Sequence, residues 1–233
     1  MKYNSIIKFR LTMKKTVIIM LLSLCVSIAF AQQPTQTSKY QNTESTEILK
    51  ELSKKITAYK SININFTFRS EKNDKLVDEI KGSTLIKGDK YVLKTNQQEI
   101  YCDGINLWNY LPEQKEVTIS LFDKEDDSQM MNPVRMIQNY EKSYKSDFIK
   151  ETIEKGVLIQ IIDLTPLKPT SYYKVRLILD KNKNQIMRLT VYEKQDMQYI
   201  YVVNKFDVNQ NLSDSQFVFD SAKFPNIEII DIR

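Results

Sequence analysis

The sequence predicts a fold of the α+β class that is mainly antiparallel β, with one helix at its start and another between strands. Three observations lead to this prediction. Apolar and polar residues alternate strictly along Ile62–Arg69, which is typical of a half-buried antiparallel strand. Turn signals then recur about every eight to twelve residues, as in a single large sheet, a sandwich or a barrel. Two segments break this pattern with the spacing of a helix.

Residues 1–31 have the layout of a secretory signal peptide. Two lysines precede an apolar run, and Ala29-Phe30-Ala31 supplies small residues where cleavage before Gln32 is expected. The alternative is a membrane anchor, which needs roughly 20 apolar residues, and this run is shorter. Residues 32–42 are polar and predict a disordered leader. Residues 43–233 are then expected to form a single domain.

The composition argues against several classes of function. The signal segment carries five basic residues and no acidic one, so its removal leaves 29 basic residues against 29 acidic ones. A net charge of zero gives no electrostatic basis for binding nucleic acid. The chain contains no histidine, which excludes Ser-His-Asp and Cys-His catalysis and removes the commonest transition-metal ligand. We therefore expect a protein without enzymatic activity, cofactor or metal.

The first half of the domain is expected to be a helix followed by a meander of strands. Residues 43–60 have apolar residues at helical spacing and two glutamates in the first turn, where the helix dipole favours them. The second strand contains Gly82, which predicts a bulge or a bend. The six strands expected in this half are 62–69, 76–86, 91–95, 99–101, 107–111 and 116–121.

Asp103-Gly104 predicts a two-residue hairpin, because glycine accepts the positive φ that a tight primed turn demands. In the strand that follows, Trp108 and Tyr110 share one face. The only tryptophan of the chain therefore sits in a hairpin with little polar chemistry around it. This indicates an apolar surface rather than a catalytic centre.

The second half is expected to begin with a helix over residues 130–144, in which Pro133 suits the first helical position. Met130, Met131 and Met136 lie in this helix, where they serve either ordinary core packing or an adaptable apolar surface for a flexible ligand. The strands expected after this helix are 148–153, 157–165, 172–179, 186–192 and 197–206. Short extended pieces at 217–219 and 227–232 finish the chain.

Four motifs occur in a recognisable order: Gly82-Ser-Thr-Leu-Ile86, Asp103-Gly104-Ile-Asn-Leu107-Trp108-Asn-Tyr110, Asn132-Pro133 and Phe217-Val-Phe219. With this order the chain resembles the LolA family of periplasmic lipoprotein carriers over residues 44–232. One departure concerns the turn after the second strand, where the family often carries an Arg-Pro pair whose arginine holds a helical lid closed. This chain has Lys87-Gly88-Asp89-Lys90 there, so its lid latch differs or is absent.

The resemblance implies an incomplete, half-open β-barrel of about eleven strands, covered by helices and curved around an apolar cavity. It implies a periplasmic monomer whose cargo is the acylated N-terminus of lipoproteins. The cargo would come from an inner-membrane lipoprotein-release transporter and pass to an outer-membrane acceptor.

Two sets of residues are expected to contact the acyl chains. We expect the concave face to be lined by Phe66, Phe68, Tyr91, Leu93, Trp108 and Tyr110, with Met131, Val134 and Ile137 on the lid. Two alternatives remain at this stage. One is a periplasmic module on the same fold that senses lipids or lipoproteins, and the other is an enzyme acting on lipid or glycan.

Overall fold

A computed structural model of the chain describes residues 43–123, 133–138 and 140–233. Contacts divide the chain into Met1–Lys39 and Tyr40–Arg233, and every described residue belongs to the second unit. The predicted signal peptide and leader, together with Met130 and Met131, lie outside the described residues.

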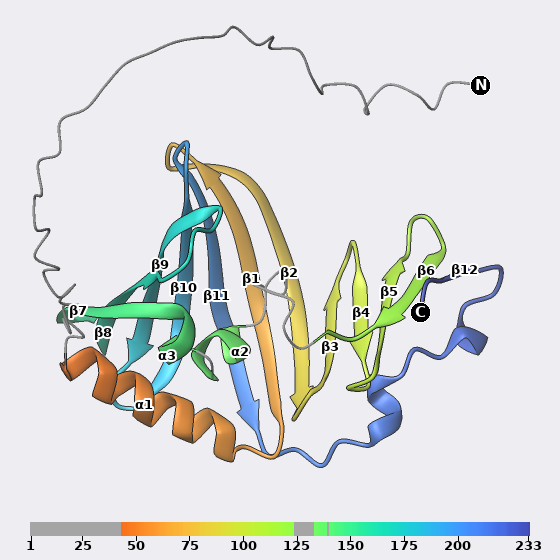
Figure 1. Cartoon of the computed structure of the whole chain (residues 1–233), viewed down its shortest axis with the longest axis horizontal. Coiled ribbons are helices and arrows are strands. Elements are labelled where there is room, and N and C mark those ends of the chain that lie inside the picture. The colour runs from red at the N-terminus through yellow and green to blue at the C-terminus, as the bar shows by residue number, and fades with distance from the viewer. Residues whose placement is uncertain (1–42, 124–132, 139) are drawn as a thin grey trace, which may run out of the picture. The chain divides into compact units, whose positions relative to one another are not determined.

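Within the described residues, twelve strands form one sheet (Figure 1). Its order is β12-β6-β5-β4-β3-β2-β1-β11-β10-β9-β8-β7. The bounds are β1 Ile62–Lys72, β2 Lys75–Lys87, β3 Lys90–Thr95, β4 Glu99–Cys102, β5 Asn106–Leu111, β6 Glu116–Leu121, β7 Tyr144–Glu154, β8 Val157–Pro166, β9 Tyr172–Asp180, β10 Gln185–Glu193, β11 Met197–Val208 and β12 Glu228–Asp231.

The sheet is open, because β12 and β7 stand at opposite ends of the strand order. Neighbouring strands pair antiparallel, except that β12 pairs parallel with β6. The mainly antiparallel, half-open architecture is thereby confirmed. The eleven expected strands are all present, and the short piece expected at 227–232 contributes β12 as the twelfth.

The hairpin between β4 and β5 is confirmed, with its turn one residue later than expected. The N–H of Asp103 donates to the carbonyl of Asn106 at 3.2 Å, so Gly104 and Ile105 are the central residues. Gly104 has a φ of 93°, which a residue with a side chain rarely adopts. The Asp103 carboxylate accepts the N–H groups of Ile105 and Asn106 at 2.8 and 2.7 Å and holds the turn.

Of the bulge or bend predicted at Gly82, the bulge is absent, because this residue pairs in continuous register with Phe66 on β1 and with Thr95 on β3. The shift between β1 and β2 lies near their hairpin, between Ser70 and Glu71. Gly82 instead leaves room on the concave face, where a side chain would point.

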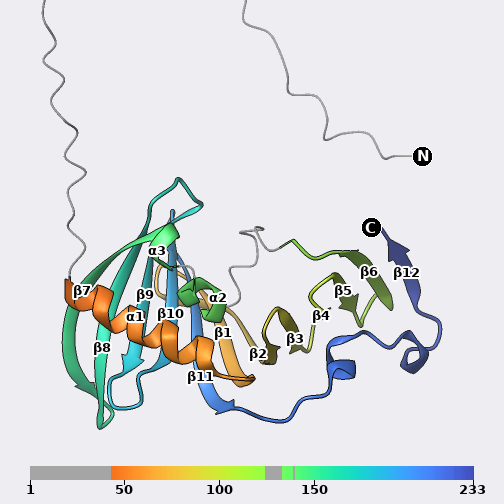
Figure 2. The ribbon, with the colours of Figure 1, turned by 60° about the horizontal axis from the view of Figure 1, so that its bottom comes forward.

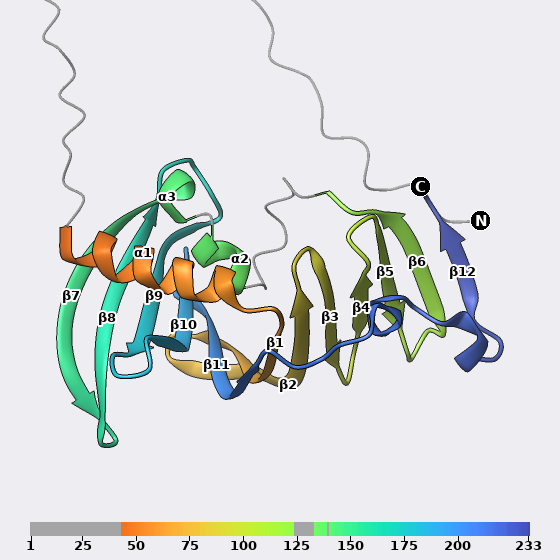
Figure 3. The same ribbon diagram turned by 90° about the horizontal axis from the view of Figure 1, so that it is seen from below.

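Three helices cover part of the concave face: α1 (Thr43–Ala58), α2 (Pro133–Gln138) and α3 (Tyr140–Ser143). Pro133 begins α2 as predicted, but the single helix expected over 130–144 is two short helices, and Tyr144 already belongs to β7. Figures 2 and 3 show α1 crossing strands β7–β11, with α2 beside it. Their apolar faces pack on the sheet in a first core cluster that includes Leu49, Leu52, Ile56, Val134 and Ile137.

The chain after β11 covers the opposite face of the other half of the sheet. This C-terminal segment (residues 209–227) contains two short 3₁₀ helices, η2 (Asp214–Phe217) and η3 (Ser221–Lys223), and leads to β12 (Figure 3). Phe217 and Phe219 pack there with Val92 and Tyr101 in a second core cluster. Val92 lies between two residues that pack with the first cluster, so the two clusters occupy opposite faces of the sheet.

Two lysines of the β2–β3 turn bind the C-terminal segment. Lys87 and Lys90 each place their Nζ 2.8 Å from the carboxylate of Asp214, and Lys87 also donates to the carbonyl of Leu212 at 2.9 Å. These hydrogen bonds lower the pKa of Asp214 to about 2. Because exposed ion pairs contribute little free energy, the aromatic packing beneath them is the main stabilising contact.

We expect Phe217→Ala to lower the free energy of unfolding by about 3–5 kcal/mol, because the ring is fully buried and its removal leaves a cavity. Urea denaturation of the purified domain measures this. Val218→Ala is the control, because the Val218 side chain, next to Phe217 in the sequence, is 41% exposed. A change within about 0.5 kcal/mol is expected for this variant. A loss below about 1 kcal/mol for Phe217→Ala would show that the C-terminal segment contributes little to stability.

Candidate functional site

The concave face contains an open cavity of about 370 Å³, within the range of small-molecule sites. Five neighbouring strands form it, in the order β3, β2, β1, β11 and β10, so that β3 and β10 are its two outer strands. Its aliphatic and phenylalanine lining consists of Phe66, Phe68, Ile80, Leu93, Leu189 and Val191. This lining makes the cavity suited to an apolar ligand.

Two aromatic pairs form the centre of the cavity floor. Phe66 stacks on Tyr201 with ring centroids 4.6 Å apart, and Phe68 stacks on Tyr199 at 6.0 Å. Burial raises the pKa of Tyr201, so its phenol stays neutral at physiological pH, and its hydroxyl is hydrogen-bonded to Thr84. The centre of the floor therefore consists of two stacked aromatic pairs without a charged side chain.

Gly82 creates the space that one of these rings occupies. A Cβ at this position would lie 2.6 Å from Cζ of Phe66 and 2.6 Å from the carbonyl oxygen of Lys94. The first contact is with a side chain, whereas the second is with backbone that cannot move away cheaply. The missing side chain thus allows the Phe66 ring to lie against β2.

The two outer strands supply the polar rim. At the end of β3, Thr95 Oγ1 accepts the N–H groups of Gln97 and Gln98 at 3.2 and 3.0 Å. The Gln98 amide donates to Asn109 Oδ1 at 2.6 Å. On β10, Glu193 accepts a hydrogen bond from Ser171 Oγ at 3.1 Å. Among the described lining residues, Glu193 alone is charged.

The cavity brings together apolar side chains rather than catalytic groups. Within the described part of the chain, no group of three or more His, Cys, Asp and Glu residues is placed to hold a metal ion. None of the described helices is long and apolar enough to span a membrane. The chemistry that the cavity offers is the burial of hydrocarbon next to a polar edge.

Three of the expected cavity residues, Phe66, Phe68 and Leu93, line the cavity. Tyr91 packs against the first core cluster, and its ring lies edge-on to the Phe122 ring, with the centroids 6.2 Å apart. Val134 and Ile137 of α2 are 3% and 0% exposed and also belong to the first core cluster, on the face of α2 that packs on the sheet. Their role as a lid stays a prediction, and Met131 lies outside the described residues.

The expected placement of Trp108 and Tyr110 on the concave face is wrong. Both pack in the second core cluster, on the opposite face of the sheet. Tyr110 lies against Phe219 and Phe224 of the C-terminal segment, with ring centroids 5.3 and 4.6 Å apart. The physical reason is that β3, β4 and β5 carry apolar residues on both faces, so alternation does not tell which face is concave.

The sequence reasoning missed the contribution of β10 and β11. Leu189, Val191, Tyr199 and Tyr201 all line the cavity. The signal was present, because Tyr199, Tyr201 and Val203 alternate with period two and therefore share one face of β11.

The open antiparallel sheet, its helical cover and its apolar cavity define a half-open sheet protein with a hollow suited to an apolar ligand. The model of the family described as outer membrane lipoprotein carrier protein LolA matches residues 57–220. The chain therefore belongs to the LolA family. Comparison with curated proteins gave no match.

Several solved structures are similar to this chain. An uncharacterized conserved protein from Thermus thermophilus has 10% identity and a TM-score of 0.56, over 81% of this chain and 99% of its own. A LolA superfamily protein from Nitrosomonas europaea has 14% identity and a TM-score of 0.42, over 76% and 98%. The Mycobacterium tuberculosis lipoprotein LppX has 12% identity and a TM-score of 0.41, over 72% and 98%. The Thermus match supports the fold.

We expect Gly82→Ala to destabilise the protein by about 1–3 kcal/mol, since the new methyl group overlaps the Phe66 ring and the Lys94 carbonyl. The sign is informative, because replacing glycine by alanine within an unobstructed strand is stabilising. Urea denaturation measures the change. Ser83→Ala, on the adjacent residue that faces the other way, is the control. A Gly82→Ala variant as stable as the parent would contradict the close packing.

Proposed function

We propose that the protein is a periplasmic carrier that binds the acyl chains of lipoproteins in the concave cavity and moves them from the inner to the outer membrane. The observation that carries this proposal is the apolar cavity of about 370 Å³ in a chain of the LolA family. The predicted signal peptide agrees with a periplasmic location.

The energetics require a shielded site. Each CH₂ group moved from water into an apolar environment gains roughly 0.8 kcal/mol, so an acyl chain exposed to the periplasm is strongly unfavourable. The aromatic floor of Phe66, Phe68, Tyr199 and Tyr201 replaces that water with apolar contacts.

The carrier must also release its cargo. We place the moving element at α2, which has only six residues and does not itself line the cavity. Its Val134 and Ile137 pack in the same core cluster as the cavity residues Phe66 and Tyr201, so a shift of α2 would loosen the packing beside the cavity. A shift of a few kcal/mol between closed and open positions is enough to load and unload the site. The inner-membrane release transporter and the outer-membrane acceptor supply that shift in this proposal.

Native mass spectrometry tests the bound species directly. Protein purified from the periplasm should carry acylated lipoprotein, and depletion of the protein should leave lipoproteins at the inner membrane. Protein that carries no acylated species would overturn the proposal. Bound cargo with normal lipoprotein sorting after depletion would favour a sensing module on the same fold instead.

We expect Ile80→Trp to weaken binding of a fluorescent acyl probe by about tenfold or more, because the larger side chain occupies part of the cavity that the acyl chain would fill, and a loss of 1.4 kcal/mol is tenfold. Fluorescence titration measures the dissociation constant. The matched control is Ile200→Trp, because Ile200 is another half-buried isoleucine, on β11, and faces away from the cavity. Equal binding by the two variants would show that acyl chains bind elsewhere.

A further inference from the structure

We infer that the cavity selects acyl chains whose head group is uncharged or cationic, and that Glu193 rejects free anionic amphiphiles. This inference rests on the proposed acyl-chain binding and adds the class of ligand to it. An acylated peptide, whose chain ends in an amide, belongs to the accepted class. A fatty acid or another single-chain lipid with a terminal anion belongs to the rejected class.

The shape of the cavity places a head group at an edge. The five strands that form it span about 19 Å along the sheet, from β3 to β10, at the usual spacing between strands. The central strands present Phe66, Phe68 and Tyr201, whereas Glu193 stands on the outer strand β10 and Gln97 and Gln98 lie in the turn that follows the outer strand β3. A chain lying across the strands therefore has its hydrocarbon over the floor and its polar end at a rim.

Both rims favour hydrogen-bonding groups, but their charges differ. The β3 rim offers the amides of Gln97 and Gln98, which are neutral and can both donate and accept. The β10 rim offers the half-buried carboxylate of Glu193, which only accepts. Ser171 supplies one hydrogen bond to it, and an amide N–H of the ligand is a suitable second donor.

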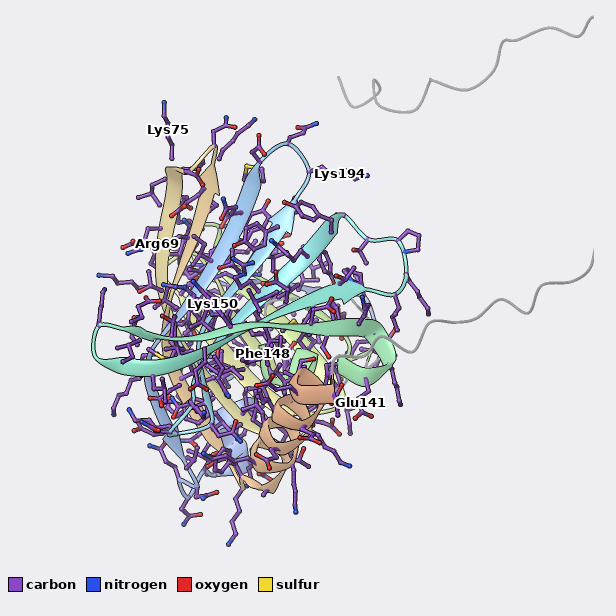
Figure 4. All side chains as sticks on the ribbon, turned by 90° about the vertical axis from the view of Figure 1, so that its left-hand side faces the viewer. Arg69, Lys75, Glu141, Phe148, Lys150 and Lys194 are labelled. Atoms are coloured by element: carbon purple, nitrogen blue, oxygen red, sulfur yellow. The ribbon has the colours of Figure 1, made fainter. Side chains whose placement is uncertain are left out.

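Several basic residues on the strands that form or flank the cavity have other partners. Lys94 is paired with Glu99 at 2.9 Å, and Lys174 lies over the Tyr192 ring at 4.2 Å. Arg176 makes a bidentate pair with Asp163 at 2.7 and 2.8 Å. Lys194, next to Glu193, is exposed at the β10–β11 turn and projects outward (Figure 4). The described lining thus offers an anion a carboxylate and no compensating cation.

A matched pair of probes tests this selectivity: N-lauroylglycinamide, which is neutral, and N-lauroylglycine, which carries a carboxylate on the same chain. Isothermal titration calorimetry of the mature protein gives both dissociation constants. We expect the neutral probe to bind about tenfold tighter, the size of one like-charge contact in a partly exposed site. Glu193→Gln should bring the ratio close to one by strengthening the binding of the anionic probe.

Glu113→Gln is the control variant, because it makes the same change of net charge at an exposed turn between β5 and β6. It should keep the tenfold ratio. Equal binding of the two probes to the parent protein, or a ratio that Glu193→Gln leaves unchanged, would overturn the inference while leaving acyl binding intact. Failure of both probes to bind would overturn the proposed function itself.

Discussion

The pairing of β1 with both β2 and β11 along its whole length is the constraint on which the rest of the structure depends. Because side chains alternate across a strand, this pairing places Phe66 and Phe68 on the concave face and polar Thr67 and Arg69 on the convex one. It also sets the Phe66 ring opposite Gly82, the position where β2 has no side chain to obstruct it. The floor of the cavity therefore follows from the register of one strand.

An open sheet of this size must cover its apolar surfaces, and the chain does so differently in its two halves. Helices α1 and α2 cover the concave face over β7–β11, whereas the C-terminal segment covers the opposite face over β3–β6. The cavity lies on the concave face of β3, β2, β1, β11 and β10, and none of its described lining residues comes from α1, α2 or the C-terminal segment. Within the described residues, the cavity is thus an apolar part of the concave face that neither of these covers lines.

Local pattern predicted most of the elements, because hairpins and alternation are encoded in neighbouring residues. All eleven expected strands are present, and Pro133 begins α2. The face of a strand was predictable only where its other side is polar, as in β1. Trp108 was assigned to the wrong side because β5 and its neighbours are apolar on both faces. What decides its position is the packing of Phe217 and Phe219, more than one hundred residues later in the chain.

The fold supplies the hollow of the cavity, whereas individual residues at its rim decide which ligands fit it. An alternating sheet with a missing side chain at Gly82 is sufficient to make an apolar hollow, and many aliphatic or aromatic residues would serve as its lining. The rim is less tolerant, since a carboxylate beside a bound head group changes which ligands bind rather than whether hydrocarbon is buried. Glu193 is the last residue of β10, just before the turn to β11. The alternation of apolar and polar residues along β10 therefore does not single it out as a binding residue. Its significance comes from lying across the sheet from Gln97 and Gln98, a relation that exists only once five strands are assembled.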